Sequence, residues 1–69
     1  MFSGEYKKIG LNIMFYRKKQ GLTQEELSEL SGVSRCRISD IERGKQSFKF
    51  DSLLLIAKAL DIDYRLLLK

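Results

Sequence analysis

Apolar residues recur at helical spacing in five segments of the chain, and glycines or helix-capping residues separate these segments. The spacing of three and four residues predicts helices over 5–20, 23–31, 34–43, 51–60 and 63–68. Only 62–64 resemble a strand, and that stretch is too short to form one. The pattern predicts a single all-α domain over 1–69, built as a five-helix bundle.

The predicted core consists of the apolar positions that fall on one face of each helix. In the first three helices these are Tyr6, Ile9, Ile13, Tyr16, Leu27, Leu30, Ile38 and Ile41. In the last two they are Leu53, Ile56, Ala57, Leu60, Tyr64, Leu67 and Leu68.

Several boundaries of these helices carry capping signals. Thr23 and Glu26 form the Thr-x-x-Glu pattern of a capping box, and Ser34 is suited to cap the third helix. We expect Asp51 or Ser52 to cap the fourth helix and Asp63 to cap the last.

The composition excludes several classes of function. With one cysteine and no histidine, the chain has neither an internal disulfide nor a zinc cluster, and it lacks Cys-His and Ser-His nucleophile pairs. We therefore expect no enzyme, no cofactor and no small-molecule ligand. The longest apolar run, 53–57, is far below the roughly 20 residues of a membrane span, so a soluble cytoplasmic protein is the expectation.

Positive charge is concentrated in two segments. The net charge is +4, and residues 1–21 and 34–49 each carry five basic side chains. Residues 22–33 carry three acidic side chains and no basic one. The predicted third helix and its flanks are therefore basic, which favours a polyanionic partner.

The segment between Leu22 and Gly44 has the spacing of a helix-turn-helix. Counted from Gln24, a small residue (Ser28), a glycine (Gly32) and two inward isoleucines fall at the fifth, ninth, fifteenth and eighteenth places. Two helices that cross at a steep angle need a small residue at the crossing, and the turn between them must admit a positive φ.

With these motifs in register, the chain resembles the lambda-repressor and Cro type (XRE-like) of helix-turn-helix domain. The matching phrases are 21–27, 32–34, 38–45 and 53–60, and the resemblance extends over about 6–68. It implies a sequence-specific transcription regulator that binds double-stranded DNA as a homodimer on a near-palindromic operator. Helix 34–43 would lie in the major groove. Restriction-modification controllers, phage repressors and antitoxins of bacteria and phages all fit this size.

The resemblance places the start of the third helix against base edges. Arg35 has the strongest physical claim, because a guanidinium can donate two hydrogen bonds to guanine; a phosphate contact is its alternative. Cys36 is expected near a thymine methyl, with redox sensing as the alternative, and Asp40 either accepts from cytosine or orients an arginine. The predicted base-contacting residues are Ser34, Arg35, Cys36, Arg37, Ser39 and Asp40.

A second group is expected to contact phosphates. Gln24 matches a phosphate-binding position of the family, and Thr23 lies beside it at a helix N-terminus, although capping alone also explains Thr23. Arg43, Lys45 and Lys49 flank the third helix as predicted phosphate contacts, with solvated surface charge as the alternative.

The family also implies a structural ion pair between Arg17 and Glu42, which would set the angle of the third helix.

Apolar residues outside the core stripes suggest partner surfaces. The resemblance implies dimerisation through the last two helices, so we predict an interface at Leu55, Tyr64 and Leu66. Leu11, Met14 and Phe15 also lie off the core stripe of the first helix. Either Phe2 covers Leu11 and Phe15, or they form a second contact.

Two competing hypotheses remain at this point. A protein-interaction module that kept the fold and lost DNA binding is the first, and the basic side chains around the third helix argue against it. A catalytic domain is the second, and the lack of suitable side chains argues against that.

Overall fold

The computed structural model describes residues 3–45 and 48–69, and every regular element in these ranges is helical. The elements are α1 (Ser3–Lys19), α2 (Gln24–Ser31), α3 (Arg35–Glu42), α4 (Phe50–Ala59) and the 3-10 helix η1 (Tyr64–Leu68). The predicted all-α fold is confirmed. The last segment differs from the prediction because its five residues wind as a 3-10 helix rather than an α-helix, a form common in short pieces.

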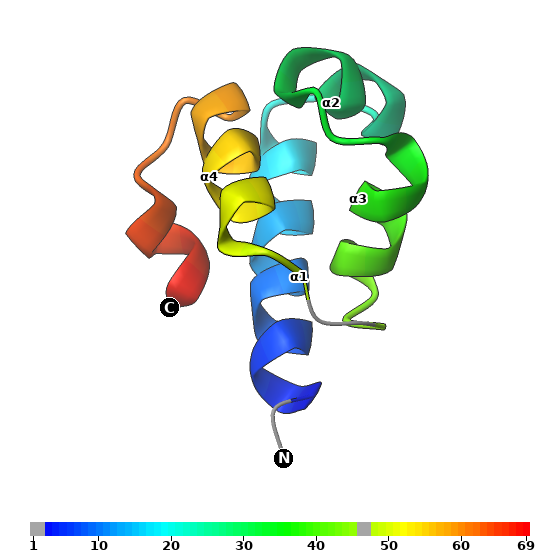
Figure 1. Cartoon of the computed structure of the whole chain (residues 1–69). Coiled ribbons are helices and arrows are strands. Elements are labelled where there is room, and N and C mark those ends of the chain that lie inside the picture. The colour runs from blue at the N-terminus through cyan, green and yellow to red at the C-terminus, as the bar shows by residue number, and fades with distance from the viewer. Residues whose placement is uncertain (1–2, 46–47) are drawn as a thin grey trace.

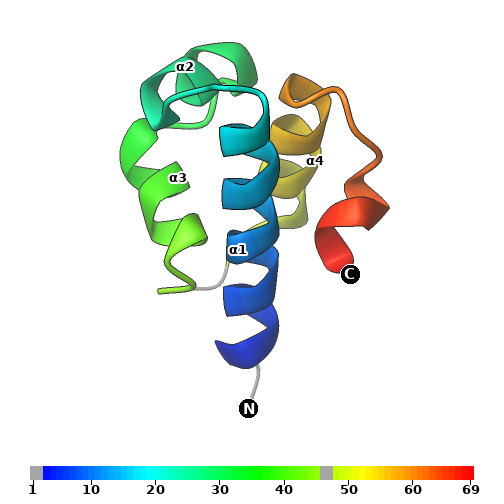
Figure 2. The ribbon, with the colours of Figure 1, turned by 180° about the vertical axis from the view of Figure 1, so that it is seen from behind.

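The longest helix, α1, is the element around which the others are arranged (Figure 1). α3 packs on one side of α1, while α4 and η1 lie on the other side (Figures 1 and 2). α2 crosses the end of the bundle and contacts both α3 and α4. The arrangement leaves the outer face of α3 uncovered within the described part of the chain.

The core joins side chains from every helix. Ten apolar side chains are buried in one cluster, which makes it the main source of stability in so small a chain. Its members are Ile13, Leu27, Val33, Ile38, Ile41, Leu53, Ile56, Ala57, Leu60 and Leu67.

The turn between α2 and α3 has the backbone that the sequence predicted. Gly32 adopts φ 80°, and its amide donates to the Ser28 carbonyl to close α2. The capping box at the start of α2 is confirmed: Thr23 Oγ1 accepts from the Glu26 amide at 3.0 Å, and Glu26 Oε1 accepts from the Thr23 amide at 2.9 Å. Ser34 caps α3 by accepting from the Arg37 amide at 3.2 Å.

Three predicted core residues are wrong, because Leu30, Tyr64 and Leu68 are all exposed. Leu30 was expected to fill the space between α2 and α3, but 60% of its surface is exposed. The buried face of α2 is instead formed by Leu27 and Ser31, which are four residues apart. Ser31 is tolerated there because its hydroxyl accepts from the Val33 amide at 3.1 Å, which satisfies the buried polar atom.

The start of α4 also differs from the prediction. α4 begins at Phe50, one residue before the segment predicted from Asp51 or Ser52, and Lys49 occupies the N-cap position without a side-chain capping bond. Asp63 does cap η1, where its side chain accepts from the Arg65 amide at 3.0 Å. Between these elements Asp61 has φ 57°, a left-handed conformation that is strained for a residue other than glycine.

Candidate nucleic-acid interface

The first turn of α3 presents a continuous row of exposed side chains. Ser34, Arg35, Cys36 and Arg37 are all exposed. Within 3–45 and 48–69, neither arginine forms an ion pair. Both guanidiniums therefore keep their donors available for a ligand.

The next turn of α3 is more enclosed. Ser39 and Asp40 are half-buried, and Asp40 Oδ1 accepts from Arg43 Nη2 at 3.2 Å. The carboxylate thus orients an arginine, one of the two roles considered for it. This ion pair stays largely in solvent, so its own stabilising effect is small.

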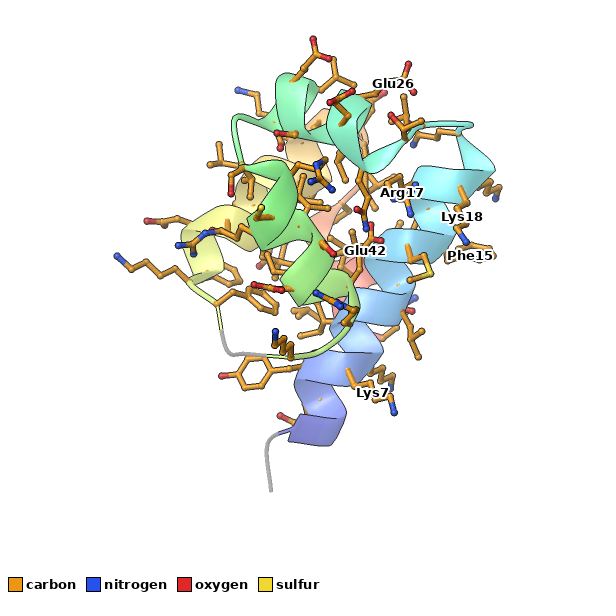
Figure 3. All side chains as sticks on the ribbon, turned by 90° about the vertical axis from the view of Figure 1, so that its right-hand side faces the viewer. Lys7, Phe15, Arg17, Lys18, Glu26 and Glu42 are labelled. Atoms are coloured by element: carbon orange, nitrogen blue, oxygen red, sulfur yellow. The ribbon has the colours of Figure 1, made fainter. Side chains whose placement is uncertain are left out.

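The inner face of α3 ends in a buried ion pair with α1. Arg17 Nε donates to Glu42 Oε2 at 2.7 Å, and Arg17 Nη2 donates to Glu42 Oε1 at 3.1 Å. Figure 3 shows the two side chains pointing toward each other from their helices. Arg17 is 8% exposed and Glu42 is 2% exposed, so each charge depends on the other for compensation.

Two further hydrogen bonds extend this pair into a network of three helices. Arg17 Nη1 donates to the Leu22 carbonyl at 2.7 Å, and Gln24 Nε2 donates to Glu42 Oε1 at 3.0 Å. Glu42 therefore links the end of α3 to α1 and to the first residue of α2. No buried side-chain nitrogen or oxygen among the described residues lacks a hydrogen-bond partner, and the joint contacts of this network hold α3 against α1 and α2.

The side chain of Gln24 is not free on the surface, as a residue that only contacts phosphate would be. It is half-buried and one of its amide hydrogens is used by Glu42. A side-chain amide carries two hydrogens, so one remains for a phosphate oxygen. Thr23 beside it is exposed, with its hydroxyl oxygen occupied by the capping bond.

The other predicted phosphate contacts lie beyond the end of α3. Arg43, Lys45 and Lys49 are exposed, and Lys45 and Lys49 form no ion pair within the described ranges. Their place after α3 and before α4 puts positive charge at the opposite end of the helix from Arg35.

Gly10 is a structural residue that the sequence reasoning missed. A Cβ on Gly10 would lie 2.1 Å from the Ile41 carbonyl oxygen and 2.8 Å from that of Glu42. α1 and the end of α3 therefore approach so closely that no side chain fits between them. A glycine inside a strong helical stripe was the available signal, because glycine destabilises a helix interior.

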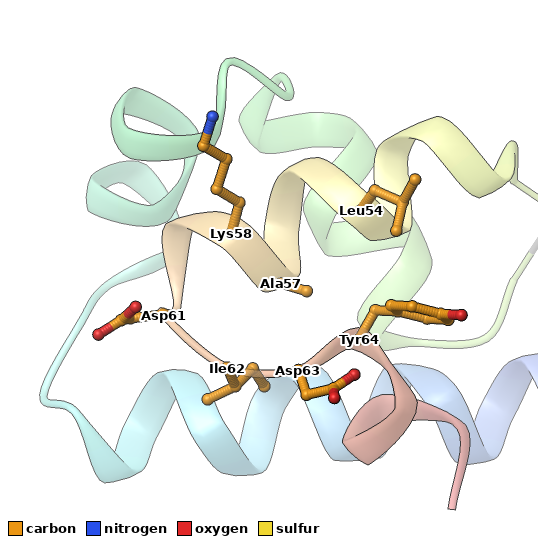
Figure 4. Close-up of a pocket in the computed structure, with 7 residues that line it drawn as sticks. All are labelled: Leu54, Ala57, Lys58, Asp61, Ile62, Asp63 and Tyr64. Carbon is orange, nitrogen blue, oxygen red and sulfur yellow. The ribbon is translucent and has the colours of Figure 1, made fainter.

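The predicted dimer residues do not gather in one hollow of the surface. Leu55 is 46% exposed and Tyr64 is 36% exposed, and the Tyr64 ring packs edge-on against Phe50 with centroids 5.4 Å apart. Tyr64 and Leu54 line a hollow of about 360 Å³ between α4 and η1 (Figure 4). Leu66 is half-buried and lines a different hollow with Asp63, Arg65 and Lys69.

Three exposed residues on this side were not predicted. Phe50 is 53% exposed, Leu68 45% and Leu54 38%. Leu54 and Phe50 extend the exposed apolar surface of α4, and Leu68 adds to that of η1.

The described residues contain neither a candidate metal site nor a helix that could span a membrane. No group of histidine, cysteine, aspartate or glutamate side chains is arranged to hold a metal ion within 3–45 and 48–69. In the same part of the chain, no helix has the length and apolarity needed to cross a membrane.

The capped helix α2, the turn at Gly32 and the exposed first turn of α3 together form a helix-turn-helix within an all-helical bundle. The helix-turn-helix family model HTH_3 matches residues 13–67, and the chain belongs to this family. It is 38% identical over 50 residues to the control protein C.SmaI of Serratia marcescens, a match that covers 72% of this chain. The same match covers 60% of C.SmaI, so the chain spans less than two thirds of that relative.

Solved structures are similar over most of the chain. The restriction-modification controller protein C.AhdI from Aeromonas hydrophila superposes with a TM-score of 0.89 and 36% identity, covering 93% of this chain and 97% of that one. A tetramer of the controller protein C.Esp1396I in complex with its natural 35 base-pair operator gives a TM-score of 0.80 and 36% identity. That match covers 84% of this chain and 76% of the controller.

Proposed function

We propose that this protein is a sequence-specific DNA-binding transcription regulator that reads the major groove with α3. The observation that carries the proposal is the contrast within α3: four adjacent residues at its start are exposed, while its end is locked by buried contacts. A rigid helix with free donors at one end suits base readout. Such a regulator acts on bacterial or phage DNA in the cytoplasm.

Within this proposal the exposed turn supplies specificity. Arg35 donates two hydrogen bonds to a guanine, and Arg37 reaches a base or an adjacent phosphate. Cys36 packs against a thymine methyl, and Ser34 and Ser39 offer hydroxyls to base edges. Asp40 acts on specificity, either directly or through the arginine that it orients.

The remaining polar residues anchor the protein to the backbone. Thr23 and Gln24 approach phosphates at the start of α2, and Arg43, Lys45 and Lys49 do so beyond the end of α3. Contacts at both ends of α3 would fix its register on the duplex.

We further propose that the protein acts as a homodimer on a near-palindromic operator. Leu55 on α4 and Tyr64 on η1 are exposed apolar side chains, and Phe50 packs against Tyr64. The use of these residues as a two-fold interface is supported by the similarity to C.Esp1396I, which is a tetramer on its operator. Half-sites would then lie about 34 Å apart.

A salt titration of binding to random duplex DNA tests the proposed function. The logarithm of the binding constant should fall linearly with the logarithm of the salt concentration, by roughly 0.9 per phosphate neutralised. Selection from a random DNA pool then identifies the preferred operator. An absence of binding even at low salt contradicts the proposal.

Sedimentation across a concentration series tests the dimer separately. Leu55→Lys should shift the protein toward monomer, because it places a charge in the apolar surface of each subunit. Leu30→Lys is the matched control, since Leu30 is equally apolar and more exposed but lies on α2. A wild-type protein that stays monomeric at high concentration contradicts the interface.

A further inference from the structure

The side of α1 that faces solvent combines large apolar side chains with lysines. Leu11 is 54% exposed and Phe15 is 59% exposed, although both lie in the middle of a 17-residue helix. With Met14, Lys18 and Lys19 they line a shallow hollow of about 630 Å³. Phe2, which was considered as a cover for Leu11 and Phe15, lies outside the described residues. We name this surface the α1 outer face; its residues are Leu11, Met14, Phe15, Lys18 and Lys19.

The α1 outer face points away from the proposed DNA-reading helix. Arg17 projects toward Glu42 on α3, whereas Phe15 and Lys18 project to the other side of α1 (Figure 3). Gly10 and Ile13 belong to the face of α1 that is buried in the protein. A partner on the α1 outer face therefore leaves α3 accessible.

Phe15 contacts two other side chains of α1. Its ring packs edge-on against Tyr16 with centroids 5.1 Å apart, and Lys19 Nζ lies 5.8 Å from the Phe15 ring centroid. An aromatic side chain has only two rotatable bonds, so it loses little conformational entropy when a partner covers it.

Both charged side chains that line the hollow, Lys18 and Lys19, are positive. Lys7, Lys8, Lys18 and Lys19 are all exposed, and Glu5 is the one carboxylate of α1. Lysines in the last turn of a helix interact favourably with the helix dipole, which accounts for Lys18 and Lys19. The dipole does not account for the apolar residues Leu11 and Phe15.

This combination selects among possible occupants. A second copy of the same face would oppose lysines with lysines, which is unfavourable. Duplex DNA presents phosphates but few apolar groups that would fill the hollow. A protein segment that carries both carboxylates and large apolar side chains matches both properties of the surface.

We propose that the α1 outer face binds a short acidic segment of another protein, which inserts one or two large apolar side chains beside Phe15 and Leu11. Lys18 and Lys19 pair with its carboxylates. The site is separate from α3, so the inference does not depend on the proposed function.

The test uses an acidic peptide as the probe. A peptide of about 12 residues, made of glutamate, leucine and phenylalanine with apolar positions three and four apart, is titrated into isotopically labelled full-length protein. Amide chemical shifts should change on α1 around Leu11, Phe15 and Lys18. A second peptide with lysine in place of glutamate should not bind.

Two variants separate the apolar and ionic contributions. Phe15→Ser should weaken binding of the acidic peptide by about tenfold, while Leu30→Ser, an equally exposed apolar control on α2, should leave it unchanged. The double variant Lys18→Glu and Lys19→Glu should lose the acidic peptide and gain the lysine peptide. Lys58→Glu, which reverses one exposed lysine on α4, should do neither.

Several results would overturn the proposal. Shifts confined to other helices, or equal binding by wild type and Phe15→Ser, would remove the α1 outer face as the site. Binding of phosphatidylglycerol vesicles without binding of the acidic peptide would assign the surface to anionic lipid.

Discussion

The two ends of α3 have opposite environments although they are only two turns apart. At the start of the helix, Arg35 and Arg37 are exposed and unpaired within the described residues. At the end, Glu42 is 2% exposed and accepts hydrogen bonds from Arg17 and Gln24. The comparison shows that a charged residue in one short helix is structural or available for binding according to the partners that the fold supplies.

The difference has an energetic consequence. Removing one partner of a buried ion pair strongly destabilises a protein, because the other charge stays buried without compensation. An exposed charge without a partner contributes little to stability, so its removal changes binding alone. Substitutions at the two ends should therefore separate stability from recognition.

The largest effect is expected from Glu42→Ala. It leaves the Arg17 charge buried without compensation, so the free energy of unfolding should fall by about 3–5 kcal/mol. Asp40→Ala, which breaks the exposed pair with Arg43, is the control and should cost less than about 1 kcal/mol. Urea denaturation measures both, and equal losses would contradict the contrast between the two ends.

Gly10→Ala tests the close approach of α1 to the same end of α3. The added Cβ meets the Ile41 carbonyl oxygen at 2.1 Å, so the helices must separate and the free energy of unfolding should fall by about 1–3 kcal/mol. Gly4→Ala adds the same methyl group to α1 where no atom lies within 4 Å. Gly4→Ala should be neutral or stabilising by up to about 1 kcal/mol. If Gly4→Ala also lowered the free energy of unfolding, the loss in Gly10→Ala could not be assigned to the clash with α3.

Arg35→Ala tests the exposed end. Stability should change by less than about 0.5 kcal/mol, whereas binding to the selected operator should weaken by about 1–3 kcal/mol with relaxed preference at one base. Lys49→Ala should weaken binding to all sequences alike and reduce the salt slope by about 1. Identical behaviour of the two variants in competition binding would contradict the division between readout and anchoring.

The smallest effect is expected at η1, away from both ends of α3. Hydrogen bonds from the Arg65 side chain and amide, with its positive charge, lower the pKa of Asp63 from 3.8 to about 2. Since the folded pKa lies below the ordinary value, the ionised carboxylate stabilises the fold above pH 3.8, and this stabilisation is lost as the pH falls toward 2. The difference in Tm between wild type and Asp63→Asn should therefore be constant near neutral pH and shrink in acid. A difference that stays constant down to pH 2 would contradict the ionic contribution of Asp63.

Local chemistry made much of the fold predictable. The capping box at Thr23 and Glu26 and the left-handed turn at Gly32 depend on residues that are close in sequence, so their geometry follows from the sequence pattern. The buried stripe of α4 was predictable for the same reason, because helical spacing alone identifies its inward residues.

The errors arose where local patterns do not determine the environment. Leu30 has the expected spacing from Leu27, yet Ser31 is the residue of α2 that is buried with Leu27, and Leu30 stays in solvent. Asp51 and Ser52 are good capping residues, yet α4 begins before them at Phe50. Leu30 shows that spacing alone does not decide which residue of a helix is buried, and α4 shows that a good capping residue does not by itself fix where a helix begins.

The placement of the candidate site depended on more than local pattern. The basic residues of 34–49 and their helical context are visible in the sequence, and they indicate which helix presents charge to a partner. The meeting of Arg17 with Glu42 was expected from the family resemblance and not from spacing. The participation of Gln24 and the contact at Gly10 were not expected at all.

The helical segments, the caps of α2 and α3 and the basic character of α3 could be read from the amino-acid sequence, because these features depend on neighbours within a few residues. The packing of the helices sets which charges are buried, where α1 and α3 approach closely at Gly10, and which apolar residues remain on the α1 outer face. The physical reason is that burial and hydrogen-bond saturation depend on contacts between residues far apart in sequence, such as Arg17 and Glu42. These contacts exist only after the helices have packed.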